Sequence, residues 1–276
     1  MDLEIGMMFW AGRDTLADVR GVGVSVGQLG IGPGVDLTPT FTAEWKDALR
    51  RESFRVVTIV AAYAGEDYAD IPTVQRTVGF IPQATREARE KRTLAISDFA
   101  AELGVKSIGC HIGFVPEEAG DSDYIAVRDM VRRVCDHAAR HGQTFALETG
   151  QEPADTLLRF IKDTDRANLK INFDPANMIL YGTGDPIEAF ERLAPHVVSV
   201  HAKDGDWPAR DKPGSLGSER RLGEGSVGMQ RFVAVMKRSG YHGTVNVERE
   251  IEDQAQRLAD IRHAVTLLRG LIGNAR

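Results

Sequence analysis

The 276-residue sequence is poor in cysteine and in basic charge, and each shortage excludes a class of protein. It has two cysteines, Cys110 and Cys135, without CxxC spacing. This is typical of reduced thiols in a cytoplasmic protein rather than of a disulfide framework or a zinc site. A net charge of −6 offers no basic surface to phosphate backbones or anionic lipid, so neither nucleic acid nor a membrane is expected as a partner.

Long apolar runs and linkers are also missing. No run approaches the roughly 18 apolar residues of a membrane span, and the first residues, MDLEIGMMFW, carry acidic charge where a signal peptide carries basic charge. We therefore expect a cytoplasmic protein. No repeat or Pro/Ser-rich segment divides the chain, which predicts one domain over residues 1–276.

What the chain does have is an alternation of short β-branched runs with longer stretches of helical spacing. Eight strands with helices between them predict a closed (β/α)8 TIM barrel, an α/β fold that reaches this length as one domain. The predicted strands are EIGMMFW (4–10), GVGVSVGQL (21–29), RVVTIVAAY (55–63), SIGCHIGF (107–114), TFALETG (144–150), LKINFD (169–174), VVSVHAKD (197–204) and TVNVERE (244–250).

Capping residues and loop composition define the segments between the strands. An Asp-Pro pair opens a helix in GDPIEAFERLAP (184–195), and longer helices are expected over 84–103 and 253–271. The long connections 64–83 and 204–228 follow the third and seventh strands. Loops after barrel strands surround the active site, so 204–228 is the best candidate for a lid.

Four successive strands are predicted to end in a carboxylate or an imidazole. The fifth ends in Glu148 and the sixth in Asp174; the seventh ends in His201 and the eighth in Glu248. Because the carboxyl ends of barrel strands meet at one face, we expect these side chains to converge.

Each of these residues alone also has a structural explanation. Asp174 precedes Pro175 and could simply start a turn, and Glu148 could cap the following helix. His201 could be a core histidine, and Glu248 could pair with an arginine. All four at one rim are harder to explain independently, so the joint pattern favours a functional site.

Electrostatics indicates what such a cluster needs. Two carboxylates about 4 Å apart repel by about 4 kcal/mol at an effective dielectric constant near 20, so either one is protonated or a cation lies among them. Three carboxylate oxygens and one imidazole suit Mn²⁺, with Mg²⁺ and Co²⁺ as alternatives, better than Zn²⁺. The predicted metal ligands are Glu148, Asp174, His201 and Glu248.

The same cluster predicts a reaction type. Glu148 and Glu248 should face each other across the barrel mouth, where one removes a proton beside a metal-polarised carbonyl and the other returns it. This predicts a metal-dependent isomerase or epimerase that acts through an enediolate. A lyase that expels a β-hydroxyl from the same enediolate, as a keto-sugar or inosose dehydratase does, stays open, and so does a non-catalytic sugar-binding barrel.

At these residues the chain resembles the sugar phosphate isomerase/epimerase family of xylose isomerase-like TIM barrels. The matching motifs are ALETGQE, NFDPAN, GDPIEAFERLAPHVVSVHAKD, LGEGSV and GTVNVERE. The resemblance implies a carbohydrate substrate, a divalent metal and a homo-oligomer. It implies the same four metal ligands, and it favours Glu248 over Glu250, which shares its strand face.

The substrate is less well defined than the metal site. Ketose 3-epimerases of this group have a histidine where Asn177 stands and an arginine where Trp207 stands, with Arg210 nearby. We take His111, at the end of the fourth strand, together with Asn177 and Arg210 as the candidate substrate-binding residues. The segment RRLGEGSV (220–227) could hold a phosphate, but without P-loop spacing a loop with solvated charges is the simpler interpretation.

Overall fold

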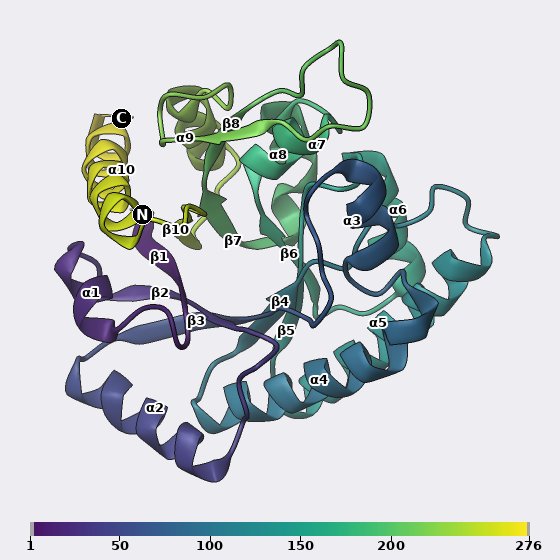
Figure 1. Cartoon of the computed structure of the whole chain (residues 1–276), viewed down its shortest axis with the longest axis horizontal. Helices are drawn as coiled ribbons and strands as arrows, with labels where there is room; N and C mark the ends of the chain where they lie inside the picture. Colours follow the sequence, from purple (N-terminus) through teal and green to yellow (C-terminus); the bar gives the residue numbers. More distant parts are fainter. Residues whose placement is uncertain (1–2, 275–276) are drawn as a thin grey trace.

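The computed structural model describes residues 3–274, and eight parallel strands close into a barrel in the order β1-β10-β7-β6-β5-β4-β3-β2 (Figure 1). This confirms the predicted (β/α)8 fold. The barrel strands are β1 Glu4–Trp10, β2 Val26–Ile31, β3 Arg55–Ala61, β4 Ser107–Cys110, β5 Thr144–Glu148, β6 Leu169–Phe173, β7 Val197–Ala202 and β10 Thr244–Val247. The ends of the expected domain, residues 1–2 and 275–276, lie outside the described residues.

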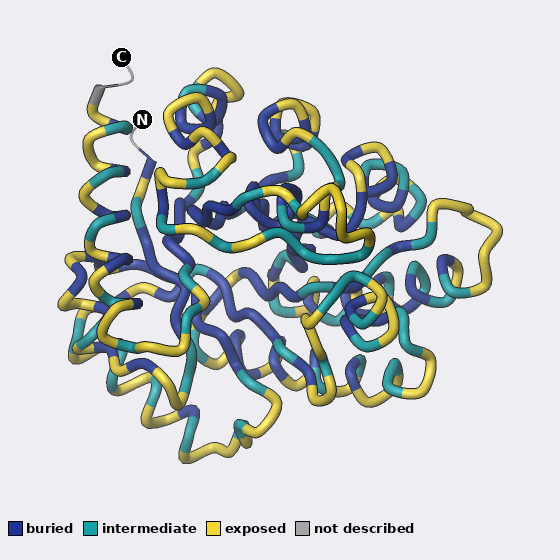
Figure 2. Tube along the Cα trace, turned by 45° about the horizontal axis from the view of Figure 1, so that its top comes forward, coloured by how far each residue is buried: buried dark blue, intermediate teal, exposed yellow. Residues whose placement is uncertain are grey.

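Helices surround the barrel, with buried residues along the strands and exposed residues on the outer helix faces (Figure 2). The described helices are α1 Leu16–Gly21, α2 Pro39–Arg51, α3 Ile71–Thr77, α4 Gln83–Glu102, α5 Ser122–Arg140, α6 Ala154–Thr164, α7 Pro175–Tyr181, α8 Pro186–Leu193, α9 Met229–Arg238 and α10 Gln254–Asn274, with the 3₁₀ helix η1 Ala194–His196. None of the helices in this part of the chain is long and apolar enough to span a bilayer.

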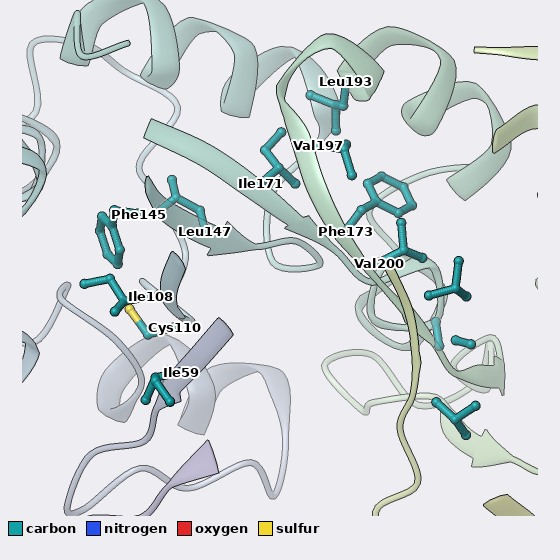
Figure 3. Packing of buried hydrophobic residues seen from close by; sticks show 14 of the residues in the cluster. Ile59, Ile108, Cys110, Phe145, Leu147, Ile171, Phe173, Leu193, Val197 and Val200 are labelled. Atoms are coloured by element: carbon teal, nitrogen blue, oxygen red, sulfur yellow. The ribbon is translucent and has the colours of Figure 1, made fainter. Parts of the chain in front are cut away.

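Side chains that point outward from the strands hold the helices in place. Ile171 and Phe173 of β6 lie between the barrel and its helices (Figure 3), and the Phe173 ring meets Phe190 of α8 edge-on, with ring centroids 5.1 Å apart. Fully burying one such side chain contributes about 1.5–3 kcal/mol. The α8 helix itself begins as predicted, because Asp185 accepts hydrogen bonds from the first-turn amides.

Side chains that point inward form a polar network, since successive residues of a strand alternate between its two faces. Asn172 of β6 is fully enclosed; its Oδ1 accepts hydrogen bonds from Gln28 Nε2 at 3.0 Å and from the Ser199 hydroxyl. The three residues come from β2, β6 and β7. This hydrogen-bond network can therefore orient a further polar side chain at the carboxyl ends of the strands.

Several predicted strand boundaries were wrong. Residues 21–25 were expected to begin a strand, but α1 extends to Gly21 and Gly23 turns the chain with φ +92°, so β2 begins at Val26. The β4 strand stops at Cys110 rather than at residue 114. The expected lid connection, 204–228, contains a two-stranded antiparallel sheet, β8 Asp204–Asp206 and β9 Ser218–Arg220, whose three-residue strands are too short to give a sequence pattern.

Candidate functional site

The four predicted metal ligands converge at the carboxyl ends of β5, β6, β7 and β10. One ligand atom from each of Glu148, Asp174, His201 and Glu248 lies within 4.8 Å of the others, and all four residues are buried. His201 Nδ1 lies 3.3 Å from Glu148 Oε1, 3.6 Å from Asp174 Oδ2 and 3.1 Å from Glu248 Oε2. Three carboxylates therefore surround one imidazole nitrogen.

Asp174 has both of the roles that the sequence suggested. Its Oδ1 accepts hydrogen bonds from the amides of Ala176 at 2.8 Å and Asn177 at 3.0 Å, which caps α7. Its Oδ2 is buried and has no hydrogen-bond partner among the described residues. One oxygen starts the helix, and the other points to the cluster.

The orientation of His201 is set from inside the barrel. Its Nε2 lies 2.6 Å from Gln28 Oε1, so Nε2 carries a proton and donates it, while Asn172 Nδ2 lies 3.0 Å from the same nitrogen. Nδ1 is buried without a hydrogen-bond partner among the described residues and faces the carboxylates. A histidine that donates through one ring nitrogen presents the other as a metal ligand.

Glu148 is contacted at one oxygen by three neighbours. Asn177 Nδ2 donates to Oε1 at 3.1 Å, and His111 Nε2 lies 3.1 Å from the same atom, beside His201. Burial alone would raise the pKa of Glu148, but the charges of His111 and His201 outweigh it and hold that pKa well below the usual range. Burial would lower the pKa of His111, whereas the negative charge of Glu148 raises it to about 9.

Glu248 is separated from Glu250 by the buried Lys203. The Lys203 ammonium lies 3.1 Å from Glu248 Oε2 and also contacts the half-exposed Glu250. Burial raises the pKa of Glu248, but the charges of His201 and Lys203 bring it down to about 2. Glu248 therefore lies in the cluster of predicted metal ligands, whereas Glu250, which shares its strand face, lies on the other side of Lys203.

The donor set fits a divalent cation. Burial would lower the pKa of His201, but the negative charges of Glu248 and Glu148 raise it well above its ordinary value. The same negative charges that raise this pKa also favour a divalent cation beside Nδ1. Asp174 Oδ2 and His201 Nδ1, which have no hydrogen-bond partner among the described residues, are the atoms that such an ion would contact.

A cavity of about 430 Å³ opens above this cluster. Glu148, Glu248, His111 and Asn177 line it, whereas Arg210 is exposed and is not among its lining residues. The structure therefore does not bring Arg210 to the site, because the loop directs it to solvent. Residues 64–83 and 204–228 both contribute to the wall, as expected for loops after barrel strands.

Sequence reasoning missed several residues of the site. Glu66, Tyr68 and Glu219 line the cavity, and Gln28 orients His201 from the far side of the barrel. Gln28 carried a usable signal, since it is the one polar side chain in the strand VGQLGI. The loop residues carried no such signal.

A second group of potential metal ligands lies outside the barrel. His137 and His141 of α5 each place Nε2 against Oδ1 of Asp98 on α4, at 2.7 and 2.9 Å. Asp98 is exposed, and both imidazoles are already paired with it. This group joins two neighbouring helices.

The sequence and the structure both match known proteins. The chain is 40% identical to a xylose isomerase domain protein from Planctomyces limnophilus, with a TM-score of 0.93 and 98% of each chain covered. A xylose isomerase-like TIM barrel protein from Mycobacterium smegmatis, solved in complex with magnesium, is 18% identical, with a TM-score of 0.72 over 94% of this chain and 87% of that one. A D-tagatose 3-epimerase-like protein is 16% identical, with a TM-score of 0.74 and 98% of each chain covered.

Curated relatives match over a shorter stretch. An uncharacterised protein from Methanocaldococcus jannaschii is 25% identical over 161 residues, which is 54% of this chain and 52% of the relative. The match therefore spans about half the length of that protein. The sequence model of the xylose isomerase-like TIM barrel family matches residues 17–271. With its closed barrel and that match over most of its length, the chain belongs to the xylose isomerase-like TIM barrel family.

Proposed function

We propose that the protein is a divalent-metal-dependent isomerase or epimerase of a sugar, a keto-sugar or a small polyol derivative. One observation carries the proposal: His201 Nδ1 and Asp174 Oδ2 are buried without a hydrogen-bond partner among the described residues, beside Glu148 and Glu248, which line a cavity. The cation of choice is Mn²⁺, with Mg²⁺ and Co²⁺ as alternatives, held by these four residues. A cytoplasmic location and a homo-oligomeric assembly stay predictions from the sequence.

Glu148 and Glu248 are the proposed acid and base. The described contacts of Glu148 go to Oε1 and those of Glu248 go to Oε2, so each carboxylate keeps a second oxygen for a substrate proton. One carboxylate takes the proton from the carbon beside the carbonyl, and the other returns it to the neighbouring carbon or to the opposite face. A bound divalent cation polarises the substrate carbonyl and so acidifies that carbon.

The remaining residues orient these two groups. Asn177 and His111 hold Glu148 Oε1, and Lys203 holds Glu248 Oε2. His111 also contacts Gln151 and lines the cavity, where it could bind a substrate hydroxyl.

Deuterium exchange tests the proposal. The Mn²⁺-loaded protein is incubated in D₂O with a panel of ketoses, inososes and 3-keto-glycosides, and the products are followed by NMR and mass spectrometry. An isomerase or epimerase incorporates deuterium into a product of equal formula. Loss of water identifies the lyase alternative, and a sugar that binds but returns unchanged identifies a sugar-binding barrel.

A further inference from the structure

The loops in which barrels commonly bind phosphate are occupied here by the chain's own carboxylates. Barrel enzymes often bind a phosphate with the loops after the seventh and eighth strands. After β7, the glycine-rich segment 222–228 surrounds the buried Asp204. Its Oδ2 accepts hydrogen bonds from the amides of Gly223 at 2.9 Å and Gly225 at 3.1 Å, and its Oδ1 accepts one from Val227 at 3.1 Å.

This arrangement argues against a phosphate grip in RRLGEGSV, because the backbone amides of the segment bind the carboxylate of Asp204. The charged side chains of Arg220 and Glu224 are exposed, as expected for a loop with solvated charges. The fit is close: a Cβ on Gly225 would lie 2.4 Å from Asp204 Oδ1. No room for a phosphate is left at these amides.

The loop after the eighth strand is filled in the same way. The amide of Glu250 donates to both carboxylate oxygens of Glu219, each at 3.1 Å, and Arg249 NH1 lies 3.1 Å from Glu219 Oε1. The backbone donor and the nearby guanidinium are therefore both committed to a glutamate. A phosphate at this point would have to displace that glutamate.

The cavity wall is acidic as well. Five glutamates line it: Glu66, Glu148, Glu219, Glu248 and Glu250. Its lining contains one lysine and no arginine within the described residues, and that lysine is bound between Glu248 and Glu250. The five glutamates and Asp174 carry six negative charges, and a divalent cation, Lys203 and Arg249 supply four positive ones, so the site stays negatively charged. A phosphate monoester would add a charge of about −1.5 to −2.

We propose that the substrate is electrically neutral and unphosphorylated, a polyhydroxylated ketone or polyol rather than a sugar phosphate. This inference rests on the proposed function of the same site. Carboxylates accept hydrogen bonds from hydroxyl groups, and the rings of Trp10, Tyr68 and Tyr181, which line the cavity, supply apolar surface for the carbons of such a molecule.

Matched pairs of ligands test the inference. Each ketose of the exchange panel is compared with its own phosphate ester, and binding to the Mn²⁺-loaded full chain is measured by isothermal titration calorimetry alongside deuterium exchange. We expect the neutral ketose to bind at least about tenfold more tightly than its ester, because like charges face each other without compensation. The ester should bind more tightly as ionic strength rises, since salt screens repulsion.

A charge-removing variant sharpens the test. Glu250→Gln removes one carboxylate from the cavity wall. At low ionic strength this should bring the dissociation constant of the ester closer to that of the ketose. Glu44→Gln removes an exposed carboxylate on α2, outside the barrel, and should leave the ratio of the two dissociation constants unchanged. A ratio that moves equally in both variants would contradict a local effect and overturn the inference.

The outcomes separate this inference from the proposed function. Neutral ketoses that bind without exchanging refute the isomerase or epimerase but support a neutral ligand. An ester that binds or exchanges better than its ketose, or whose binding weakens with salt, overturns the inference and leaves the isomerase or epimerase standing. A panel in which no neutral member binds also overturns it.

Discussion

Two clusters of histidine and carboxylate among the described residues have opposite surroundings. In the barrel, His201 Nδ1 lies among three buried carboxylates and has no hydrogen-bond partner among the described residues. On the outer helices, His137 and His141 are both paired with the exposed Asp98. Judged by residue type alone, both clusters are candidate metal sites.

The two clusters differ in whether their polar atoms have hydrogen-bond partners. A buried polar atom without a partner costs about 1–3 kcal/mol, so unpartnered atoms persist where a ligand satisfies them or where strain is tolerated. Asp174 Oδ2 and His201 Nδ1 are buried atoms without a hydrogen bond among the described residues, whereas both outer imidazoles are paired with Asp98, which is exposed. Burial and missing hydrogen bonds, rather than residue types, therefore identify the candidate metal centre.

The largest expected effect is the loss of metal from the barrel. His201→Ala removes the imidazole ligand and leaves three carboxylates facing one another, so bound Mn²⁺ should fall to near zero and any exchange activity by more than about a hundredfold. The matched control is His141→Ala in the outer cluster, which should keep one metal per chain by elemental analysis. Equal metal loss in the two variants would contradict the assignment of the barrel site.

The next effect concerns the residue that orients His201. Gln28→Leu removes the acceptor of the His201 Nε2 proton, and metal affinity should fall by about 10–100-fold, as for other groups behind a metal ligand. Gln143→Leu is the control, because this buried glutamine bonds Ser97 and Val105 away from the cluster. It should lower stability but not the affinity measured by calorimetric titration with Mn²⁺. If only Gln143→Leu lowered the affinity for Mn²⁺, the assignment of Gln28 as the residue that orients His201 for metal binding would be wrong.

The sequence predicted the barrel and the four converging residues because both follow from local patterns. Strand ends are visible as apolar runs that stop at a charge, and the barrel topology brings those ends together. Gln28 and Lys203 were not assigned roles, since their functions depend on partners 173 and 45 residues away in sequence. Arg210 was misplaced because loop direction has no periodic signal.

A smaller effect is expected from the residue that marks the departure from ketose 3-epimerases. Asn177→Ala removes the donor to Glu148 Oε1, so the exchange rate should fall by about tenfold while metal affinity changes less. The control is Asn168→Ala, whose amide binds the carbonyls of Cys135 and Gln143. An exchange rate unchanged in Asn177→Ala would show that this hydrogen bond does not position Glu148 for proton transfer.

The smallest effect belongs to the outer cluster. Asp98→Asn should leave metal content unchanged and lower stability by about 1 kcal/mol or less, as for other exposed pairs, which shifts Tm by a few degrees at most. Burial raises the pKa of Asp98, but hydrogen bonds from His137 and His141 outweigh it and lower that pKa below its ordinary value. A lowered carboxyl pKa stabilises the folded state above the unfolded-state pKa, and this contribution is lost as the pH falls through the folded-state pKa. The difference in Tm between wild type and Asp98→Asn should therefore be present at neutral pH and disappear in acid. A difference that persisted after Asp98 had been protonated would show that the cluster joins α4 and α5 by packing rather than by its charge.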